Sequence, residues 1–245
     1  MPTSKLVPPS EAYVKAMILA AGLGRRMLPL TQNTPKPLLE VAGKPLLEHH
    51  ILNLSTAGIT ELVINAAYLA DQIIAFCGDG SRWGVKIRVS VESEPLETAG
   101  GIIKALPLLG DTPFLVVNSD IWCPFPFDRL IECAPLEGGA HLILVPNPPH
   151  HADGDFSLEQ GCVRVKSQIA FTYSGIGIYH PQFFQGFSSA KRPVKQPLKP
   201  LLDAAITAGK VTGELHTGTW IDVGTPQRLQ ALNEARQTAA PLNGR

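Results

Sequence analysis

The feature that most constrains this chain is an apolar run, Ala16 to Ala21, that leads directly into a glycine turn made by Gly22 and Gly24. A run of this length suits a buried strand of a parallel sheet. Glycine lets the backbone approach an anion closely, and successive N–H groups form a concave anion site. The stretch therefore predicts a strand whose end cradles a polyphosphate.

Three cations frame the same turn. Arg25 and Arg26 follow it at once, and Lys36 lies between two prolines. Arginine offers planar, bidentate recognition of phosphate, and lysine offers a point charge. A Gly-x-Gly spacing alone also describes an ordinary turn, and Met27 stands where a dinucleotide-binding fingerprint would have its third glycine. The three cations together favour the phosphate site.

Apolar segments of strand and helix character alternate along the rest of the chain. This order predicts an α/β fold with a mostly parallel, doubly wound sheet. We expect a flexible extension over residues 1–14 and a single domain over 15–240, in which 146–180 form a small β lobe. The expected strands are Glu61–Asn65, Val85–Val91, Phe114–Asn118, His141–Val145, Cys162–Val165, Phe171–Tyr179 and Trp220–Val223, and the expected helices are Pro45–Ala57, Ala70–Cys77, Glu97–Leu106, Pro197–Ala208 and Thr225–Gln237.

The composition excludes several classes of partner. With 21 basic and 21 acidic residues the formal charge is +0, so no overall basic excess drives binding to nucleic acid or to an acidic membrane. The first residues lack the apolar core of a signal peptide, and no apolar run is long enough to cross a bilayer. Four scattered cysteines, none in a Cys-x-x-Cys pair, fit free thiols in a reducing cytoplasm.

Two aspartates follow expected strands. Asp120 comes just after Phe114–Asn118, and Asp222 lies in the segment TWIDVGT. Ligands of a doubly wound sheet bind at the carboxyl ends of its strands, and Mg²⁺ binds through one or two carboxylates plus substrate phosphates. Each aspartate alone also suits the capping of a turn. Together with the basic loop, they predict a magnesium site.

The segment LAAGLGRRMLPLTQNTPKPLLEVAGKPLLE resembles the signature of the sugar-phosphate nucleotidyltransferases. The resemblance runs from about Lys15 to the last helix and implies a three-layer, Rossmann-like fold with a sugar-binding β lobe. It implies that Asp120 and Asp222 bind Mg²⁺ and that Arg26 and Lys36 are catalytic, holding the phosphates at the reacting centre. The family often has Thr in place of Arg25, which gives that residue less weight.

The resemblance also implies contacts to the two substrates. It places the nucleotide against the glycine loop and against the segment PLETAGG, and it places the sugar near Gly175 of YSGIGIY. The nucleotide-binding residues that it implies are Leu19, Ala20, Ala21, Gly22, Gly24, Arg25, Arg26, Asn65, Glu97, Thr98 and Gly100, and the sugar-binding residues are Asn118, Asp155 and Gly175. Glu97 and Thr98 also suit a plain helix cap, and Asn65 also suits a loop anchor.

Many thymidylyl- and uridylyltransferases of this family carry a Glu-Lys-Pro triplet in the β lobe, and this chain has none. The segment NPPHHADGDF precedes the lobe instead, and this pattern is most similar to the family members of cell-wall sugar recycling that join UTP to N-acetylmuramate 1-phosphate. His150 and His151 would then meet the carboxylate of that sugar, or form a solvated loop pair. One of Lys195 and Lys199 would replace the missing lysine, or both lie in a solvated charged loop.

Three other functions stay open at this point. Within the family they are guanylyl transfer to mannose 1-phosphate and thymidylyl transfer to glucose 1-phosphate. A different class is a non-catalytic sugar-nucleotide sensor, against which the intact Arg26, Lys36, Asp120 and Asp222 argue. We expect a monomer or a small homo-oligomer.

Overall fold

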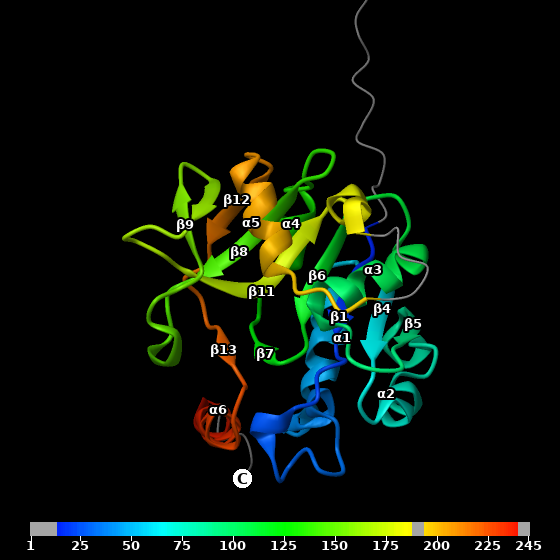
Figure 1. Cartoon of the computed structure of the whole chain (residues 1–245). Coiled ribbons are helices and arrows are strands. Elements are labelled where there is room, and N and C mark those ends of the chain that lie inside the picture. Colours follow the sequence, from blue (N-terminus) through cyan, green and yellow to red (C-terminus); the bar gives the residue numbers. More distant parts are fainter. Residues whose placement is uncertain (1–13, 188–193, 240–245) are drawn as a thin grey trace, which may run out of the picture.

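Nine strands form one sheet in the order β5-β4-β1-β6-β11-β8-β12-β10-β9 (Figure 1). The computed structural model describes residues 14–187 and 194–239, so the expected extension over 1–14 lies outside the described residues except for Val14. The strands are β1 (Ala16–Leu19), β4 (Glu61–Ala66), β5 (Lys86–Val91), β6 (Phe114–Asn118), β8 (Ala140–Val145), β9 (Phe156–Glu159), β10 (Cys162–Val165), β11 (Thr172–Tyr179) and β12 (Val211–Leu215).

The sheet is mostly parallel. β1 pairs in parallel with β4 and β6, β4 pairs in parallel with β5, and β12 pairs in parallel with β8. β11 is antiparallel to both of its neighbours, and β10 is antiparallel to β12 and β9. All strands except β11 and β10 therefore run in one direction, which confirms the α/β fold class.

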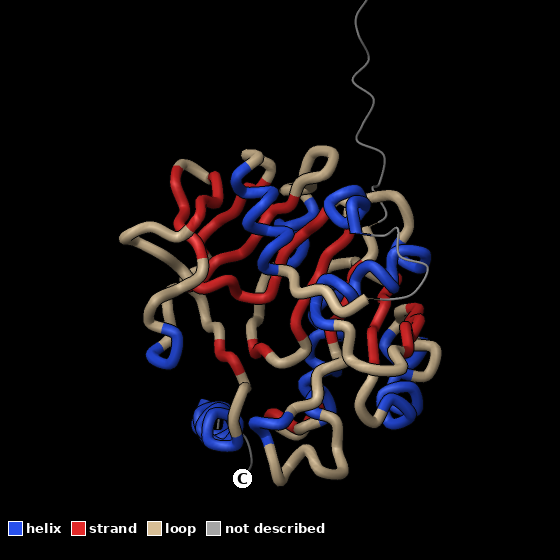
Figure 2. Tube along the Cα trace, viewed as in Figure 1, coloured by secondary structure: helices blue, strands red, loops and turns tan. Residues whose placement is uncertain are grey.

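Alternating side chains of the central strands pack into two separate cores. In β1, Ala16 and Ile18 join one core, whereas Met17 joins the other. Helices cover both faces of the sheet, and Figure 2 shows the strands lying between these helices. One core includes α1 (Leu46–Thr56), α2 (Ala70–Cys77) and α4 (Phe127–Ile131), and the other includes α3 (Glu97–Leu109) and α5 (Lys199–Thr207). The result is a three-layer fold.

The strands expected in a small β lobe belong to the same sheet. β11 lies between β6 and β8 in the middle of the sheet, and β10 forms a hairpin with β9 at its edge. This region differs from a regular parallel sheet because β11 and β10 are antiparallel to their neighbours and because the register of β11 shifts between Tyr173 and Ile176. β9, β12 and α4 were not among the elements expected from the sequence.

Two small pairings lie beside the sheet. β2 (Glu40–Val41) pairs with β3 (Lys44–Pro45), and β7 (Ile121–Trp122) pairs with β13 (Ile221–Asp222). The last helix, α6 (Pro226–Ala239), lies beside the segment that contains β2 (Figure 1). The remaining short helices are η1 (Arg25–Met27), η2 (Lys36–Leu38), η3 (Ser81–Trp83), η4 (Pro149–His151) and η5 (Pro181–Phe187).

A third apolar core fastens α6 to the loop after β1. Met27 and Val41 from the loop region pack with Leu229 and Leu232 of α6. Asn233 adds polar contacts, since its Oδ1 accepts from Ala42 N at 2.8 Å and its Nδ2 donates to the carbonyl of Glu40 at 3.0 Å. The end of the described chain thus supports the loop near its beginning.

Candidate active site

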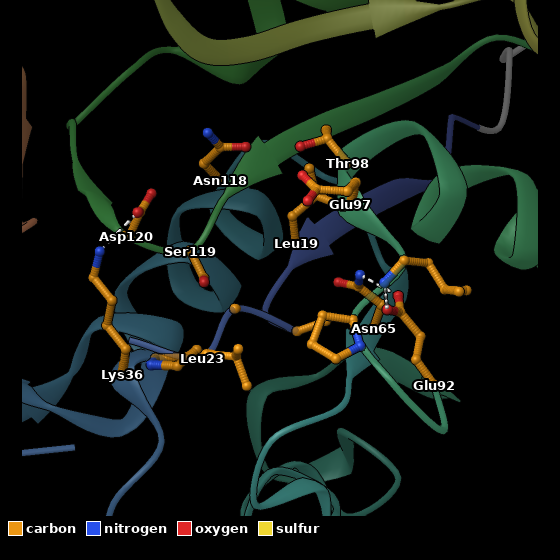
Figure 3. A pocket seen from close by; sticks show the side chains of 15 residues that line it. Leu19, Leu23, Lys36, Asn65, Glu92, Glu97, Thr98, Asn118, Ser119 and Asp120 are labelled. Atoms are coloured by element: carbon orange, nitrogen blue, oxygen red, sulfur yellow. Dashed lines mark hydrogen bonds and ion pairs between the residues drawn. The ribbon is translucent and has the colours of Figure 1, made fainter. Parts of the chain in front are cut away.

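The carboxyl ends of three adjacent strands bring polar side chains into one row. Leu19 at the end of β1 is in register with Asn65 of β4 on one side and with Asn118 of β6 on the other. In a doubly wound sheet this edge is where ligands bind. The row is the floor of the cavity drawn in Figure 3.

The glycine loop brings Lys36 to this edge. Gly24 has φ +62°, and a Cβ there would lie 2.9 Å from Thr31 Cγ2 and 3.3 Å from Lys36 Cβ. Thr31 Oγ1 donates to the carbonyl of Gly24 at 2.8 Å and closes the turn. Only glycine suits both the left-handed backbone and the close approach, so Gly24 lets the stem of Lys36 pack against the turn.

Lys36 and Asp120 form an ion pair at one end of the cavity. Lys36 Nζ donates to Asp120 Oδ2 at 2.7 Å, and Lys36 is only 8% exposed. The Asp120 side chain is 34% exposed, so the pair is partly buried and its charges interact more strongly than those of a fully exposed pair. The pair therefore holds both side chains at a fixed place.

The first cavity has a volume of about 350 Å³ and lies over the sheet edge. The glycine loop borders it on one side and the start of α3 on the other (Figure 3). Its lining residues are Leu19, Ala21, Gly22, Leu23, Lys36, Pro37, Asn65, Glu92, Pro95, Leu96, Glu97, Thr98, Asn118, Ser119 and Asp120. It contains most of the residues expected to bind the nucleotide.

A second cavity, of about 340 Å³, adjoins the first. Asn118 and Asp120 line both cavities. The other lining residues of the second cavity are Arg26, Ile121, Pro148, His150, His151, Thr172, Tyr173, Ser174, Trp220 and Asp222. The site thus has two compartments that meet at one carboxylate and one amide.

The β7–β13 pairing brings the two expected metal ligands to the second cavity. Asp222 is in register with Ile121, and Val223 N donates to the carbonyl of Asp120 at 2.9 Å. Residues that are far apart in the sequence therefore become backbone neighbours. Both Asp120 and Asp222 line this cavity.

Each of these acids has a cationic partner within the chain. Arg228 Nη1 of α6 donates to Asp222 Oδ2 at 2.5 Å and to His150 Nε2 at 2.9 Å, and His150 Nε2 lies 3.3 Å from Asp222 Oδ2. Asp120 has Lys36. Within residues 14–187 and 194–239 no three His, Cys, Asp or Glu side chains gather into a group that could hold a metal ion.

The cations of the glycine loop separate between the two compartments. Lys36 borders the first cavity, whereas Arg26 borders the second. Arg25 and Arg26 are both exposed, in η1. Arg25 is not among the described residues that line either cavity, which agrees with the smaller weight that its position received.

Two glycines expected at the substrates instead make room for protein groups. A Cβ on Gly100 would lie 2.5 Å from the carbonyl oxygen of Val194, and Gly100 N donates to the carbonyl of Gln196. Gly175, at φ +82°, faces Asn118, because a Cβ there would lie 2.5 Å from Asn118 Nδ2. Neither is among the described residues that line a cavity.

Ala20 and Asp155 form hydrogen bonds to residues that line the two cavities, and neither lines a cavity itself among the described residues. Ala20 N donates to Asn65 Oδ1 at 2.8 Å, which fixes the end of β1. Asp155 accepts from Tyr173 N at 2.8 Å and lies 3.0 Å from His151 Nε2. Asp155 therefore anchors two residues of the second cavity without lining it.

The histidine pair of the NPPHHADGDF segment lies at the second cavity, so it is not a solvated loop pair alone. Lys195 and Lys199, one of which was expected to replace the missing lysine of the triplet unless both lie in a solvated charged loop, form ion pairs with other residues. Lys195 Nζ lies 2.7 Å from Glu94, and Lys199 Nζ lies 2.8 Å from Asp203. Neither lines the two cavities among the described residues.

Sequence reasoning missed Glu92 and Arg228. Glu92 is 3% exposed and lines the first cavity, and Arg228 holds Asp222. A polar residue at the end of an expected strand, as Glu92 is after Val91, was a usable signal. Arg228 gave no such signal, because in the sequence it is an ordinary polar residue of a terminal helix.

Comparison with known proteins agrees with this arrangement. The family model described as nucleotidyl transferase matches residues 15–239. The chain is 50% identical over 224 residues to the N-acetylmuramate alpha-1-phosphate uridylyltransferase of Neisseria meningitidis serogroup B, covering 89% of this chain and 96% of that protein. It is 33% identical to the mannose-1-phosphate guanyltransferase of Aspergillus fumigatus, of which it spans 62% of the length.

Solved structures share the fold. A putative glucose-1-phosphate thymidylyltransferase from Bacillus anthracis, in complex with a sucrose, aligns with a TM-score of 0.80 at 22% identity, over 91% of this chain and 94% of that one. HddC from Yersinia pseudotuberculosis, complexed with GMP-PN, aligns with a TM-score of 0.74 at 23% identity, over 91% and 99%.

Proposed function

The chain belongs to the nucleotidyl transferase family and is a sugar-1-phosphate nucleotidyltransferase, and from this premise we propose that it joins UTP to N-acetylmuramate 1-phosphate. The products are the UDP-sugar and pyrophosphate. The similarity to the Neisseria enzyme, at 50% identity over most of both chains, supports this substrate pair.

The observation that carries the proposal is the meeting of two compartments at Asp120 and Asn118. A nucleotide in the first cavity and a sugar 1-phosphate in the second would face each other across these two side chains. Holding two reactants in line converts a bimolecular step into an effectively unimolecular one. The α-phosphate of UTP would lie at this junction.

The chemistry is an in-line displacement at phosphorus. A phosphate oxygen of the sugar 1-phosphate forms a bond to the α-phosphorus of UTP, and the bond to the bridging oxygen of the β-phosphate breaks, so pyrophosphate leaves with the electron pair. The nucleophile is already an anion and needs no general base. Lys36 offsets the repulsion between the two polyanions, and Arg26 holds the leaving phosphates.

The donor set at the junction suits Mg²⁺. Asp120 and Asp222 offer carboxylate oxygens, and Mg²⁺ is commonly bound through one or two carboxylates plus substrate phosphates. Among the described residues these are the two acids that line the second cavity, so the phosphates would complete the set, and the pairings with Lys36 and Arg228 would give way. When bound, the ion would neutralise charge on both substrates.

The second cavity suits a sugar that bears a carboxylate. His150 and His151 line it, and both side chains can donate to an anion. N-acetylmuramate has such a carboxylate, whereas mannose and glucose do not. This lining supports N-acetylmuramate 1-phosphate over the neutral sugar phosphates, and with it a role in cell-wall sugar recycling.

The setting follows from the same proposal. All four cysteines lie in the described part of the chain and are free thiols, which fits the reducing cytoplasm where UTP is found. No helix within the described residues is long and apolar enough to cross a membrane.

A pyrophosphate-release matrix tests the proposal. Five nucleoside triphosphates are combined with the 1-phosphates of N-acetylmuramate, N-acetylglucosamine, glucose and mannose, each with and without Mg²⁺. We expect the highest kcat/KM for UTP with N-acetylmuramate 1-phosphate. A preference for GTP with mannose 1-phosphate, or for dTTP with glucose 1-phosphate, would replace the substrate pair. Nucleotide binding without Mg²⁺-dependent turnover would favour the sensor.

A further inference from the structure

A buried carboxylate lies under the segment that starts α3. Glu92 follows β5 directly and is 3% exposed. Its Oε1 accepts from Asn65 Nδ2 at 2.7 Å, and its Oε2 accepts from the backbone N–H of Leu96 at 2.9 Å. Both oxygens are thus engaged by neutral N–H donors, and the described residues give Glu92 no ion pair.

Asn65 extends this contact to the glycine loop. Its other amide atom, Oδ1, accepts from Ala20 N at 2.8 Å, and Asn65 is itself 3% exposed. The chain of hydrogen bonds therefore joins the end of β1, the end of β4, the end of β5 and the start of α3. Figure 3 shows this group at the end of the cavity opposite to the Lys36–Asp120 pair.

The packing of α3 is built around the same two side chains. A Cβ on Gly101 would lie 2.7 Å from Asn65 Nδ2 and 2.8 Å from Glu92 Oε1. Gly101 has an ordinary helical backbone, so its lack of a side chain serves this close approach and not a special turn. The hydrogen bonds of Glu92 and the missing side chain of Gly101 are two independent observations that point to the same contact, between α3 and the side chains of Asn65 and Glu92.

The segment that Glu92 holds is the wall of the first cavity. Pro95, Leu96, Glu97 and Thr98 all line it. Glu97 has φ +63°, a left-handed conformation that disfavours a side chain. A conformation of this kind persists only where the surroundings enforce it, and the preceding residue is held on both sides: Leu96 N donates to Glu92 Oε2 at 2.9 Å, and the carbonyl of Leu96 accepts from Gln196 N at 3.0 Å.

We propose that Glu92 is a positioning residue for nucleotide recognition, which sets the wall Pro95–Thr98 against the glycine loop through Leu96 N and Asn65. The inference rests on the proposed assignment of the first cavity to the nucleotide. A carboxylate is required because both contacts are donors, whereas a glutamine would turn its own NH₂ group toward one of them. Glu92 acts through its neighbours and takes no part in the bond-making step.

The test compares Glu92→Gln with Glu94→Gln. Glu94 lies two residues along the same segment, is exposed and pairs with Lys195, so it is a matched control. For Glu92→Gln we expect the dissociation constant and the KM of UTP to rise about tenfold, which corresponds to one mismatched buried donor at about 1.4 kcal/mol. The KM of the sugar 1-phosphate and kcat stay within about twofold, and Glu94→Gln matches the unaltered protein.

A second variant covers the case in which Glu92→Gln does not fold. Gly101→Ala leaves both hydrogen-bonding partners intact but pushes on their atoms, and it should raise the same two constants for UTP. Binding of UTP is measured by calorimetry beside turnover, so a failure of the proposed reaction leaves this test standing. Unchanged UTP binding in a folded Glu92→Gln or Gly101→Ala protein, or a loss of kcat alone, would overturn the proposal.

Discussion

Lys36 shows how a single residue can serve both the structure and the reaction. Its stem packs against the left-handed turn at Gly24, and its ammonium group lies 2.7 Å from Asp120. A buried lysine keeps its charge only with a partner of opposite charge or with bound anions. The position that the sequence marks by two flanking prolines is therefore the charged centre of the site.

We expect Lys36→Met to lower kcat/KM by about two orders of magnitude or more, by analogy with the loss of about 3 kcal/mol when one transition-state donor is removed. The physical reason is the uncompensated repulsion between two polyanions at the junction. Steady-state pyrophosphate release measures the change, and Lys44→Met, an exposed lysine in β3, is the control. Rates within threefold of the unaltered protein would contradict the role given to Lys36.

Gly175→Ala tests the contact between Gly175 and Asn118. The new Cβ would lie 2.5 Å from Asn118 Nδ2, so the amide shared by the two cavities must move, and we expect kcat/KM to fall roughly tenfold or more. Gly161→Ala is a matched control, because Gly161 has φ +76° but nothing within 4 Å of its Cβ.

Urea titrations and rate measurements separate the two effects of this substitution. Both alanine variants should lose roughly 1 kcal/mol of unfolding free energy from the left-handed backbone. Only Gly175→Ala should lose activity. Equal kinetics in the two variants would show that the position of Asn118 is not critical.

At the scale of elements, α6 supports the site from outside the sheet. It supplies Arg228 to Asp222, and its apolar side packs on Met27 and Val41 near the glycine loop. Thr225 Oγ1 accepts from Arg228 N at 3.3 Å, which is the contact of an N-cap just before α6. Arg228 therefore takes part in both, because its backbone N–H binds the cap residue Thr225 and its side chain binds Asp222.

Thr225→Ala should lower the unfolding free energy by about 1 kcal/mol, the usual loss for an N-cap. Because the first turn of α6 also holds Arg228, we expect the variant to lose activity at a temperature at which the unaltered protein keeps it. Thr238→Ala is the control, since Thr238 Oγ1 donates to carbonyls near the other end of α6. Thermal unfolding followed by circular dichroism gives the comparison.

The sequence predicted the long periodic elements well. α2 and β6 begin and end at the expected residues, α1 is one residue shorter than expected at each end, and β4 is one residue longer at its end. The missed elements lack a local signal. α4 has five residues, too few to show helical periodicity, and β12 and β9 interleave polar residues or glycine and owe their pairing to distant strands.

The same distinction applies to the site. Lys36, Asp120 and Asp222 could be selected from the sequence as candidate site residues, because they follow strands or a glycine turn. Arg228 could not, because its role is defined by His150, a partner far away in the sequence, and Glu92 follows a strand although its contact with Asn65 is visible only in the fold. Gly100, expected at the nucleotide, faces Val194 for the same reason.

On the scale of the whole molecule, the core contains a titratable group behind the site. His50 of α1 is 2% exposed, and burial lowers its pKa to about 4, outweighing the opposing influence of the Ile121 backbone and the Asp120 carboxylate. The neutral ring is therefore the form that the fold accommodates. In the unfolded chain the ring titrates at its ordinary pKa of about 6.5.

The low pKa of His50 in the folded protein makes the free energy of unfolding depend on pH. Between about pH 4 and 6.5 the unfolded state binds the extra proton, so stability is complete above pH 6.5 and falls as the pH decreases toward 4. We expect a loss of roughly 2 kcal/mol between pH 7 and pH 5 from His50 alone. Urea unfolding at both pH values measures it, and His50→Leu should show a smaller difference by about that amount. An equal difference in both proteins would rule out His50 as the source.

The pairing of β13 with β7 has a consequence for how the protein comes into being. Asp222 reaches Asp120 only when the last strand lies against a segment made a hundred residues earlier on the ribosome. A nascent polypeptide that already carries the glycine loop, the lysine and the first aspartate has only one of the two acids. Catalytic competence would then arrive in a single step once β13 has been made, and products terminated before it would be silent.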